Sequence, residues 1–238
     1  MLALGCNIFN MGVIPCLIIY PLIFKPLVKK GMTVGRISAA SIIAVVVGLQ
    51  LGAFGVVLET LFSGITELPF STFALLMQPI HLAIGVVEGI ITAAVLCFVY
   101  KMRPEILEST FERTAIKSGV SMKNVLVSLV IITLLVGGVL AIFASSNPDG
   151  LEWAMEKVAG TTELEASGSV VESAASIQQA TAFMPDYDFK EVGEEGSLTG
   201  TTVAGVVGGA ITFLLAGVVA FLISFAKKKR RGNVIASV

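Results

Sequence analysis

Two ionisable side chains, His81 and Glu88, stand inside one long apolar stretch of the chain. His81 is the only histidine of the sequence, and Glu88 follows it seven residues later. In a helix this spacing is close to two turns, so both side chains project from nearly the same face. Imidazole binds metal ions and carries protons, and a charge at membrane depth costs about 2.5–3.5 kcal/mol on insertion scales. We therefore expect this face to point into a bundle or a cavity and not into lipid.

Each of these side chains also has a structural interpretation. Glu88 could be protonated or hydrogen-bonded to a neighbouring helix, and His81 could cap a helix near the membrane surface. A second polar group lies near the start of the chain, where Asn7 and Asn10 are one helical turn apart. Amides within hydrocarbon either join helices, at roughly 0.6–2 kcal/mol per contact, or line a pathway. Residue types and spacing leave both roles open.

The elements that must position these residues are membrane-spanning helices. Hydrophobic residues make up 55% of the chain and charged residues only 14%, which is typical of an integral membrane protein. About 20 apolar residues cross a bilayer as a helix, whereas the stretch 68–77 is too short and is predicted to be re-entrant or interfacial. We expect an all-α polytopic bundle with about five transmembrane helices, at residues 5–24, 37–58, 79–100, 125–144 and 203–226.

Basic residues are concentrated in alternate loops. They follow the first, third and fifth spans, and the last group is Lys-Lys-Lys-Arg-Arg at 227–231. The segment 59–78 has none, and the segment 145–202 has two lysines against eleven acidic residues. Because basic loops stay in the cytoplasm, we predict a multi-pass cell-membrane protein with its N-terminus outside and its C-terminus cytoplasmic. The basic tail is expected to contact membrane lipid and not nucleic acid.

Smaller motifs predict local structure. Asn-Pro-Asp-Gly at 147–150 is a turn, followed by a short helix carrying Trp153, and the residues from 161 to 180 are expected to be flexible. Pro15 and Pro21 are expected to kink or end the first helix. Packing faces are predicted by three G-x-x-x-G spacings, at Gly48–Gly52, Gly85–Gly89 and Gly205–Gly209. The cysteines, expected to be buried and unpaired, are Cys6, Cys16 and Cys97.

Two stretches resemble a known family. Residues 4–12 (Leu-Gly-Cys-Asn-Ile-Phe-Asn-Met-Gly) and 79–89 (Pro-Ile-His-Leu-Ala-Ile-Gly-Val-Val-Glu-Gly) resemble the cobalt/nickel substrate-specific component of energy-coupling factor transporters, the CbiM/NikM family. Residues 125–230 resemble the small accessory component, and 148–152 reads Pro-Asp-Gly-Leu-Glu, the motif that names the PDGLE domain. The resemblance implies two domains, a CbiM/NikM-like domain at 1–118 and a PDGLE domain at 119–238 around an outer loop at about 145–202.

The resemblance implies import of Co(II) or Ni(II), driven by separate ATP-hydrolysing subunits and a transmembrane coupling subunit. In the family the ion is held by an N-terminal segment beginning Met-His, whereas residue 2 here is Leu2 and no histidine precedes His81. The chain thus resembles an N-terminally truncated member, and its metal ligands stay unassigned. Asn7, Asn10, His81 and Glu88 would line the transport pathway or orient the ligands. No permanently bound cofactor is expected.

Other functions remain as alternatives. An accessory or structural membrane subunit that binds a transporter, but no metal, would also fit a chain without the Met-His ligands. A metal-dependent membrane protease is excluded by the single histidine, since H-E-x-x-H needs two. Neither G-x-S-x-G nor the phosphate-binding G-x-x-x-x-G-K-[ST] occurs, so we expect no enzyme, and any ATP hydrolysis must come from a partner.

Overall fold

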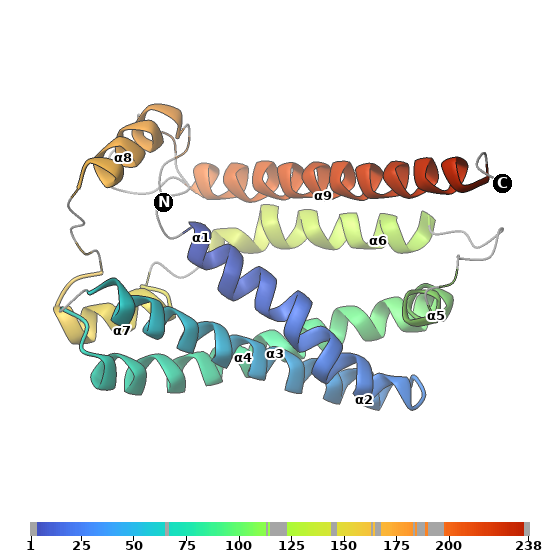
Figure 1. Cartoon of the computed structure of the whole chain (residues 1–238), viewed down its shortest axis with the longest axis horizontal. Helices are drawn as coiled ribbons and strands as arrows, with labels where there is room; N and C mark the ends of the chain where they lie inside the picture. Colours follow the sequence, from blue (N-terminus) through green and yellow to red (C-terminus); the bar gives the residue numbers. More distant parts are fainter. Residues whose placement is uncertain are drawn as a thin grey trace. The chain divides into compact units, whose positions relative to one another are not determined.

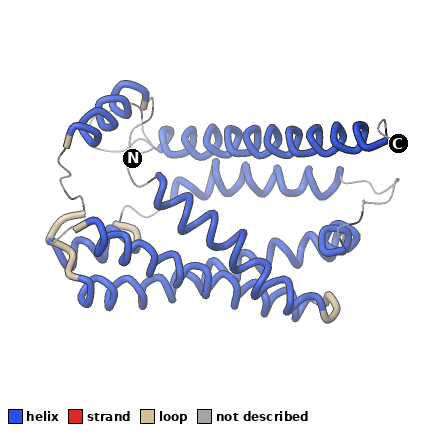
Figure 2. The backbone as a smooth tube through the Cα atoms, in the orientation of Figure 1, coloured by secondary structure: helices blue, strands red, loops and turns tan. Residues whose placement is uncertain are grey.

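The structure is a computed structural model in which every regular element of the described part of the chain is a helix (Figures 1 and 2). The described residues are 4–64, 67–112, 114, 123–143, 147–162, 164, 168–182, 184, 189 and 198–235. The prediction of an all-α membrane protein is confirmed. Parts of the outer loop and of the linker after residue 112, including Arg113, lie outside these ranges.

Four of the described helices are long and apolar enough to cross a membrane. Three helical segments form the first span, Gly5–Lys29; they are α1 (Leu4–Asn7), η1 (Ile8–Phe24) and α2 (Lys25–Lys29). The others are α3 (Val34–Ser63), α4 (Phe70–Met102) and the part Gly200–Ala226 of α9 (Leu198–Ile235). The fourth predicted span is a shorter apolar helix, Lys123–Val139. The remaining helices are α5 (Pro104–Glu112), α6 (Lys123–Leu134), η2 (Leu135–Val139), η3 (Leu140–Phe143), α7 (Gly150–Ala159) and α8 (Ser169–Thr181).

The chain forms two compact units that do not follow chain order. One unit comprises residues 1–125 and 146–180, and the other comprises 126–145 and 181–238. Helix α7 therefore packs in the first unit, with η1, α3 and α4. In the second unit α9 packs against η2, where the hydroxyl of Thr202 donates to the carbonyl of Gly138 at 3.0 Å. Gly205 lies against the Gly137 backbone, whereas Gly209 of the same predicted motif faces open space.

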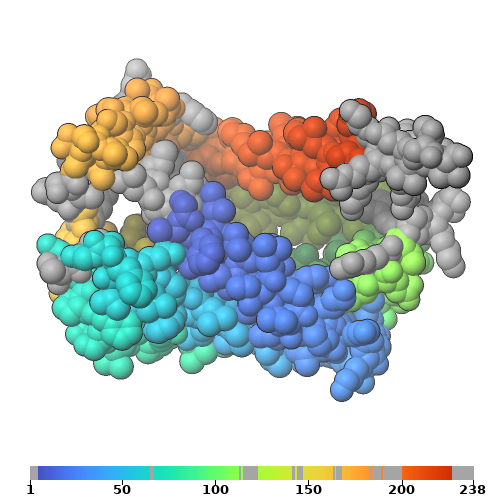
Figure 3. Space-filling view, viewed as in Figure 1, coloured from blue at the N-terminus to red at the C-terminus, as the bar shows by residue number. Residues whose placement is uncertain are grey.

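Glycines let α3 and α4 approach closely. A Cβ on Gly89 would lie 2.8 Å from Cα of Ile42, and one on Gly85 would lie 3.2 Å from Cα of Val46. On the other side of α3, a Cβ on Gly48 would lie 3.5 Å from the Ile19 side chain. The packing role predicted for these spacings is confirmed, and α3 is the central helix of the unit. Figure 3 shows the surfaces of η1 and of the C-terminal half of α3 in direct contact.

Helix α4 begins at Phe70, so the prediction of a separate re-entrant piece at 68–77 and a span starting at Pro79 is wrong. Pro79 lacks the N–H that would bond to the carbonyl of Leu75, yet α4 continues through it. Here the side chain of Gln50 donates to the carbonyl of Gln78 at 2.9 Å, and the side chain of Gln78 donates to the carbonyl of Gln50 at 3.4 Å. These two bonds tie α3 to α4 directly before the proline.

Prolines do not end the first span either. Its helical path runs from Leu4 to Lys29, and wide turns with i→i+5 hydrogen bonds carry η1 past Pro15 and Pro21. A wider turn leaves room for the proline ring against the preceding turn. The expected burial of the cysteines is also wrong: Cys16 is exposed and the other two are partly exposed, because each helix packs on one side only, and all three thiols are free.

Two apolar clusters close opposite ends of the α3–α4 pair. At one end, Val57, Phe73 and Met77 pack around Ala154 of α7, with Trp153 beside them. At the other end, Val28 and Ile37 pack with Leu107 of α5. The short helix predicted after the Asn-Pro-Asp-Gly turn is thus present as α7. By contrast, most of the stretch 161–180, expected to be flexible, belongs to helix α8, Ser169–Thr181, in which none of the residues is buried. Alanine, glutamine and glutamate favour a helix without a core.

Candidate functional site

A cavity of about 280 Å³ lies within the first unit, lined by residues of the first span, α3, α4 and the start of α7; we call it the polar cavity because polar side chains gather in its otherwise apolar wall. All four residues singled out in the sequence line it: Asn7, Asn10, His81 and Glu88. Leu49, Gly52, Met77 and Ile84 contribute apolar walls. The structure therefore brings together side chains that are separated by more than seventy residues in the sequence.

Asn10 is the buried polar residue of the cavity wall, with 3% of its surface exposed. Its Nδ2 donates to both carboxylate oxygens of Glu59, at 3.1 Å each, and so connects η1 to α3. The Cys6 thiol hydrogen-bonds the same carboxylate. The other amide atom, Oδ1, has no hydrogen-bond partner and lies against Gly55, where a Cβ would force the Asn10 side chain to move. An unsatisfied buried acceptor costs about 1–3 kcal/mol, so this arrangement is held by its surroundings.

The His81 ring is fixed within its own helix. Its Nδ1 lies 2.8 Å from the carbonyl oxygen of Met77. Because a carbonyl can only accept, Nδ1 carries the proton and the other nitrogen, Nε2, is left with its lone pair in the neutral ring. A hydrogen bond from one ring nitrogen to a carbonyl is the usual way to orient the other for a ligand. His81 is partly buried and faces the first turn of α7, at Gly150.

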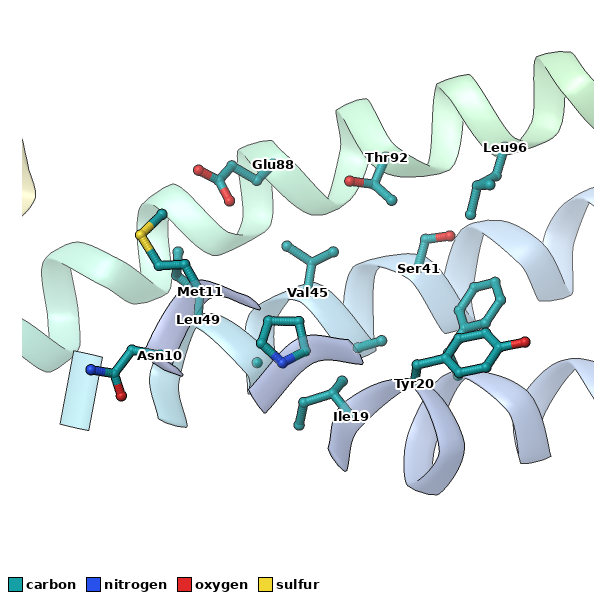
Figure 4. Close-up of a pocket in the computed structure, with 14 residues that line it drawn as sticks. Asn10, Met11, Ile19, Tyr20, Ser41, Val45, Leu49, Glu88, Thr92 and Leu96 are labelled. Atoms are coloured by element: carbon teal, nitrogen blue, oxygen red, sulfur yellow. The ribbon is translucent and has the colours of Figure 1, made fainter. Parts of the chain in front are cut away.

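Glu88 lies seven residues after His81 on α4 and lines two cavities. Besides the polar one, it lines a larger, mostly apolar cavity of about 430 Å³ between η1, α3 and α4 (Figure 4). The carboxylate points toward Met11 on η1, and Ser41 and Thr92 add hydroxyl groups along the same cavity. Glu88 is exposed, unlike Asn10, although it shares the cavity with it. His81 and Glu88 thus share one face of α4, as expected from their spacing.

Two participants were missed by the sequence reasoning. Glu59 was assigned to an outer loop because it follows an apolar run, yet α3 continues to Ser63 and holds its carboxylate against Asn10. Asp149 was read only as part of a turn, but it lines the cavity from the N-terminus of α7. Gly48, Gly52, Gly55 and Glu59 follow one another at helical intervals of three or four residues. This spacing could have predicted that α3 extends as far as Glu59.

The cavity wall carries side chains that can bind a cation, but they do not form a complete set of metal ligands. Imidazole and carboxylate both bind divalent ions, and imidazole suits Co(II) and Ni(II). Nevertheless, within the described ranges no group of three His, Cys, Asp or Glu side chains lies close enough to hold a metal ion. His81, Asn10 and Glu88 therefore act as wall residues of a cavity and do not by themselves form a metal site.

The fold and this cavity define a multi-pass α-helical membrane protein with a protein-lined polar interior. Residues 1–106 match the family model of the cobalt uptake substrate-specific transmembrane region, and residues 123–225 match that of the PDGLE domain. The chain therefore carries, on one polypeptide, a region that matches each of the two families, as the sequence resemblance predicted. No curated protein and no solved structure matches the chain.

Proposed function

We propose that the chain is the substrate-specific membrane component of an energy-coupling factor transporter that imports Co(II) or Ni(II). The observation that carries the proposal is the gathering of Asn7, Asn10, His81 and Glu88 around one cavity inside a cobalt-uptake region. Polar side chains in membrane spans are rare and mark pathways for ions. On this proposal the four residues line the route of the ion or orient its ligands.

The chemistry of the cavity supports a divalent cation as substrate. The His81 ring presents Nε2, while Glu88 supplies a carboxylate on the same helix face. Asn10 and Glu59 fix the distance between η1 and α3, which keeps the cavity open beside them. We propose the domain division 1–118 and 119–238, with the second domain contributing α7 to the cavity wall.

The proposed orientation places the N-terminus of this chain outside and the C-terminus in the cytoplasm. It is supported by the two ends of the first unit: α7, from the acidic segment, packs in one cluster with Leu68, and α5 packs beside α2 with its lysines. Energy would come from ATP-hydrolysing subunits through a transmembrane coupling subunit. The sequence itself carries no phosphate-binding loop.

The experiment is uptake of radioactive Co(II) and Ni(II) by cells that express the chain with the proposed partner subunits and lack their own uptake system. Replacing His81→Ala or Glu88→Gln is expected to reduce uptake about 10–100-fold, the usual effect of groups that orient metal ligands. Glu172→Gln, at an exposed position of α8, is the control. Membrane abundance must be equal for all variants. Normal uptake by both cavity variants would refute their role.

A second candidate is an accessory subunit that binds no metal itself. It is favoured by the lack of a three-ligand group among the described residues. Equilibrium dialysis of the purified chain against Co(II) and Ni(II) separates the two candidates. The same measurement on the chain extended by any in-frame Met-His segment encoded upstream tests whether the principal ligands lie there. Binding only by the extended chain supports transport, and binding by neither supports the accessory role.

A further inference from the structure

Helix α7 belongs to the PDGLE region by sequence but to the cobalt-uptake region by packing. Residues 123–225 match the PDGLE model, whereas Gly150 and Ala154 of α7 are buried within the unit formed by residues 1–125 and 146–180. Ala154 has no exposed surface and joins Phe73 and Met77 in one apolar cluster. The segment containing the Pro-Asp-Gly-Leu-Glu motif therefore sits on α4 as an integral part of this unit.

Gly150 is the point of closest approach. A Cβ at this position would lie 2.8 Å from Cδ1 of Ile84, 3.1 Å from Cε1 of His81 and 3.4 Å from Nε2 of His81. The first of these distances is shorter than real Cβ contacts, but Cδ1 is the mobile end of the Ile84 side chain. The His81 ring is held by its bond to Met77 and would also have to give by a few tenths of an ångström, so a side chain at 150 would crowd the space between α7 and α4. Glycine at 150 is favoured by this contact and not by the backbone conformation, since α7 has an ordinary helical backbone there.

The ring edge that meets Gly150 is the one free to react. Nδ1 of His81 is engaged by the Met77 carbonyl, so a metal ion or a proton could be taken only at Nε2. Nε2 and Cε1 are the atoms that α7 covers. Asp149, Gly150 and Leu151 at the same time form part of the wall of the polar cavity. One short helix thus covers both the imidazole and one side of the cavity.

We propose that α7 is a lid over His81, and that the contact of Gly150 with Ile84 and the His81 ring sets how closely the lid seats. Lifting α7 would uncover Nε2 and open the cavity beside it. This inference rests on the proposed function for its biological meaning, because the lid would then control access of the ion. The seating contact itself is independent of transport. Gly150 is a positioning residue and touches no substrate.

The chain carries its own probes for this contact, because it has one histidine and one tryptophan. Diethyl pyrocarbonate acylates the free imidazole nitrogen, and its rate at His81, followed by mass spectrometry of the purified tag-free chain, reports how well Nε2 is covered. Trp153 is part of α7 and packs against the adjoining apolar cluster, so its fluorescence emission reports whether α7 is docked. Neither measurement needs a metal ion or a partner subunit.

Gly150→Ala is expected to raise the rate of His81 modification on the order of tenfold and to shift Trp153 emission to longer wavelength, since overpacking disfavours the seated helix. Glu156→Ala, exposed on the same helix, is the control and should leave both unchanged. Adding Ile84→Val to Gly150→Ala removes the Cδ1 atom that the new methyl group meets. The double variant is expected to return toward the wild-type rate, which a simple loss of folding would not allow.

An unchanged rate in Gly150→Ala, or a double variant no more protected than Gly150→Ala, would overturn the lid. A complete absence of Co(II) and Ni(II) uptake by the wild-type chain with its partners would instead refute the proposed function and leave the seating contact standing. If both hold, Gly150→Ala is expected to change the uptake rate while Glu156→Ala does not.

Discussion

The amide of Asn10 and the carboxylate of Glu59 form the polar connection between the first span and α3. Two hydrogen bonds of 3.1 Å leave the same Nδ2 atom and reach the two oxygens of Glu59. Directly beside them, Gly55 makes room for the unpartnered Oδ1 of Asn10. The pair thus couples a buried amide to a partly buried acid at the edge of the polar cavity.

Asn10→Ala is expected to lower the free energy of unfolding by about 1–3 kcal/mol, because the Glu59 carboxylate loses a donor in a partly buried site. Asn7→Ala is the matched control, one turn away on the same helix and exposed. Its effect should stay within about 0.5 kcal/mol. Chemical denaturation in detergent micelles measures both. Equal destabilisation by the two variants would mean that the Asn10–Glu59 bonds contribute nothing specific.

Gly89 controls the spacing of α3 and α4. Gly89→Ala places a methyl group 2.8 Å from Cα of Ile42, and backbone cannot move aside as a flexible side chain can. We expect a loss of about 1–3 kcal/mol of stability from this overpacking. Gly35→Ala on α3 has open space around it and should be neutral or slightly stabilising. A thermal-unfolding midpoint that drops as far for Gly35→Ala as for Gly89→Ala would contradict the close approach.

Local sequence patterns predicted the helices well but misplaced some of their ends, including the end of α3 and the start of α4. Length and hydropathy identify α3 and α4, and the spacing of seven residues puts His81 and Glu88 on one face. The start of α4 was missed because Pro79 was read as a helix start. The hydrogen bond that the proline cannot make is local, whereas the bonds that join Gln50 and Gln78 involve another helix and cannot be read from the neighbouring sequence.

The composition of the cavity depended on tertiary packing in the same way. Asn10 and Glu59 are 49 positions apart, and nothing in either local sequence pairs them. The docking of α7 is a stronger case, since the resemblance assigns its motif to the accessory domain while Ala154 is buried against Phe73 and Met77. A family motif indicates which segment matters, but not which surface that segment covers.

Gln50 of α3 and Gln78 of α4 join the two helices, because each side chain donates to the backbone carbonyl of the other residue. Gln50→Leu removes the donor to the Gln78 carbonyl, and Gln78→Leu removes the donor to the Gln50 carbonyl. Each change is expected to lower stability by roughly 0.6–2 kcal/mol, with the larger effect for Gln50, whose bond is shorter. Thr60→Val is the control, because its hydroxyl bonds only to Val56 in the same helix. Chemical denaturation in detergent micelles measures the free energy of unfolding of each variant. An equal loss in all three would show that the bonds between helices contribute no more than a bond within one helix.

Helix α7 begins with a capping box that should determine its own stability. The Asp149 carboxylate accepts from the N–H groups of Leu151 and Glu152, at 2.8 and 2.9 Å, and the Glu152 side chain accepts from the Asp149 N–H at 3.3 Å. Asp149→Ala is expected to destabilise the helix by about 0.5–2 kcal/mol, whereas Asp149→Asn keeps an acceptor and should retain most of that stability.

Amide hydrogen exchange over 150–159 measures this stability directly, and Trp153 emission reports whether the frayed helix leaves α4. Because the cap is separate from the Gly150 contact, Asp149→Ala should speed exchange throughout α7 while Gly150→Ala acts first on its seating. If Asp149→Asn weakened protection as much as Asp149→Ala, the negative charge and not the cap would be what holds α7, and the acidic residue would then act through the cavity that it lines.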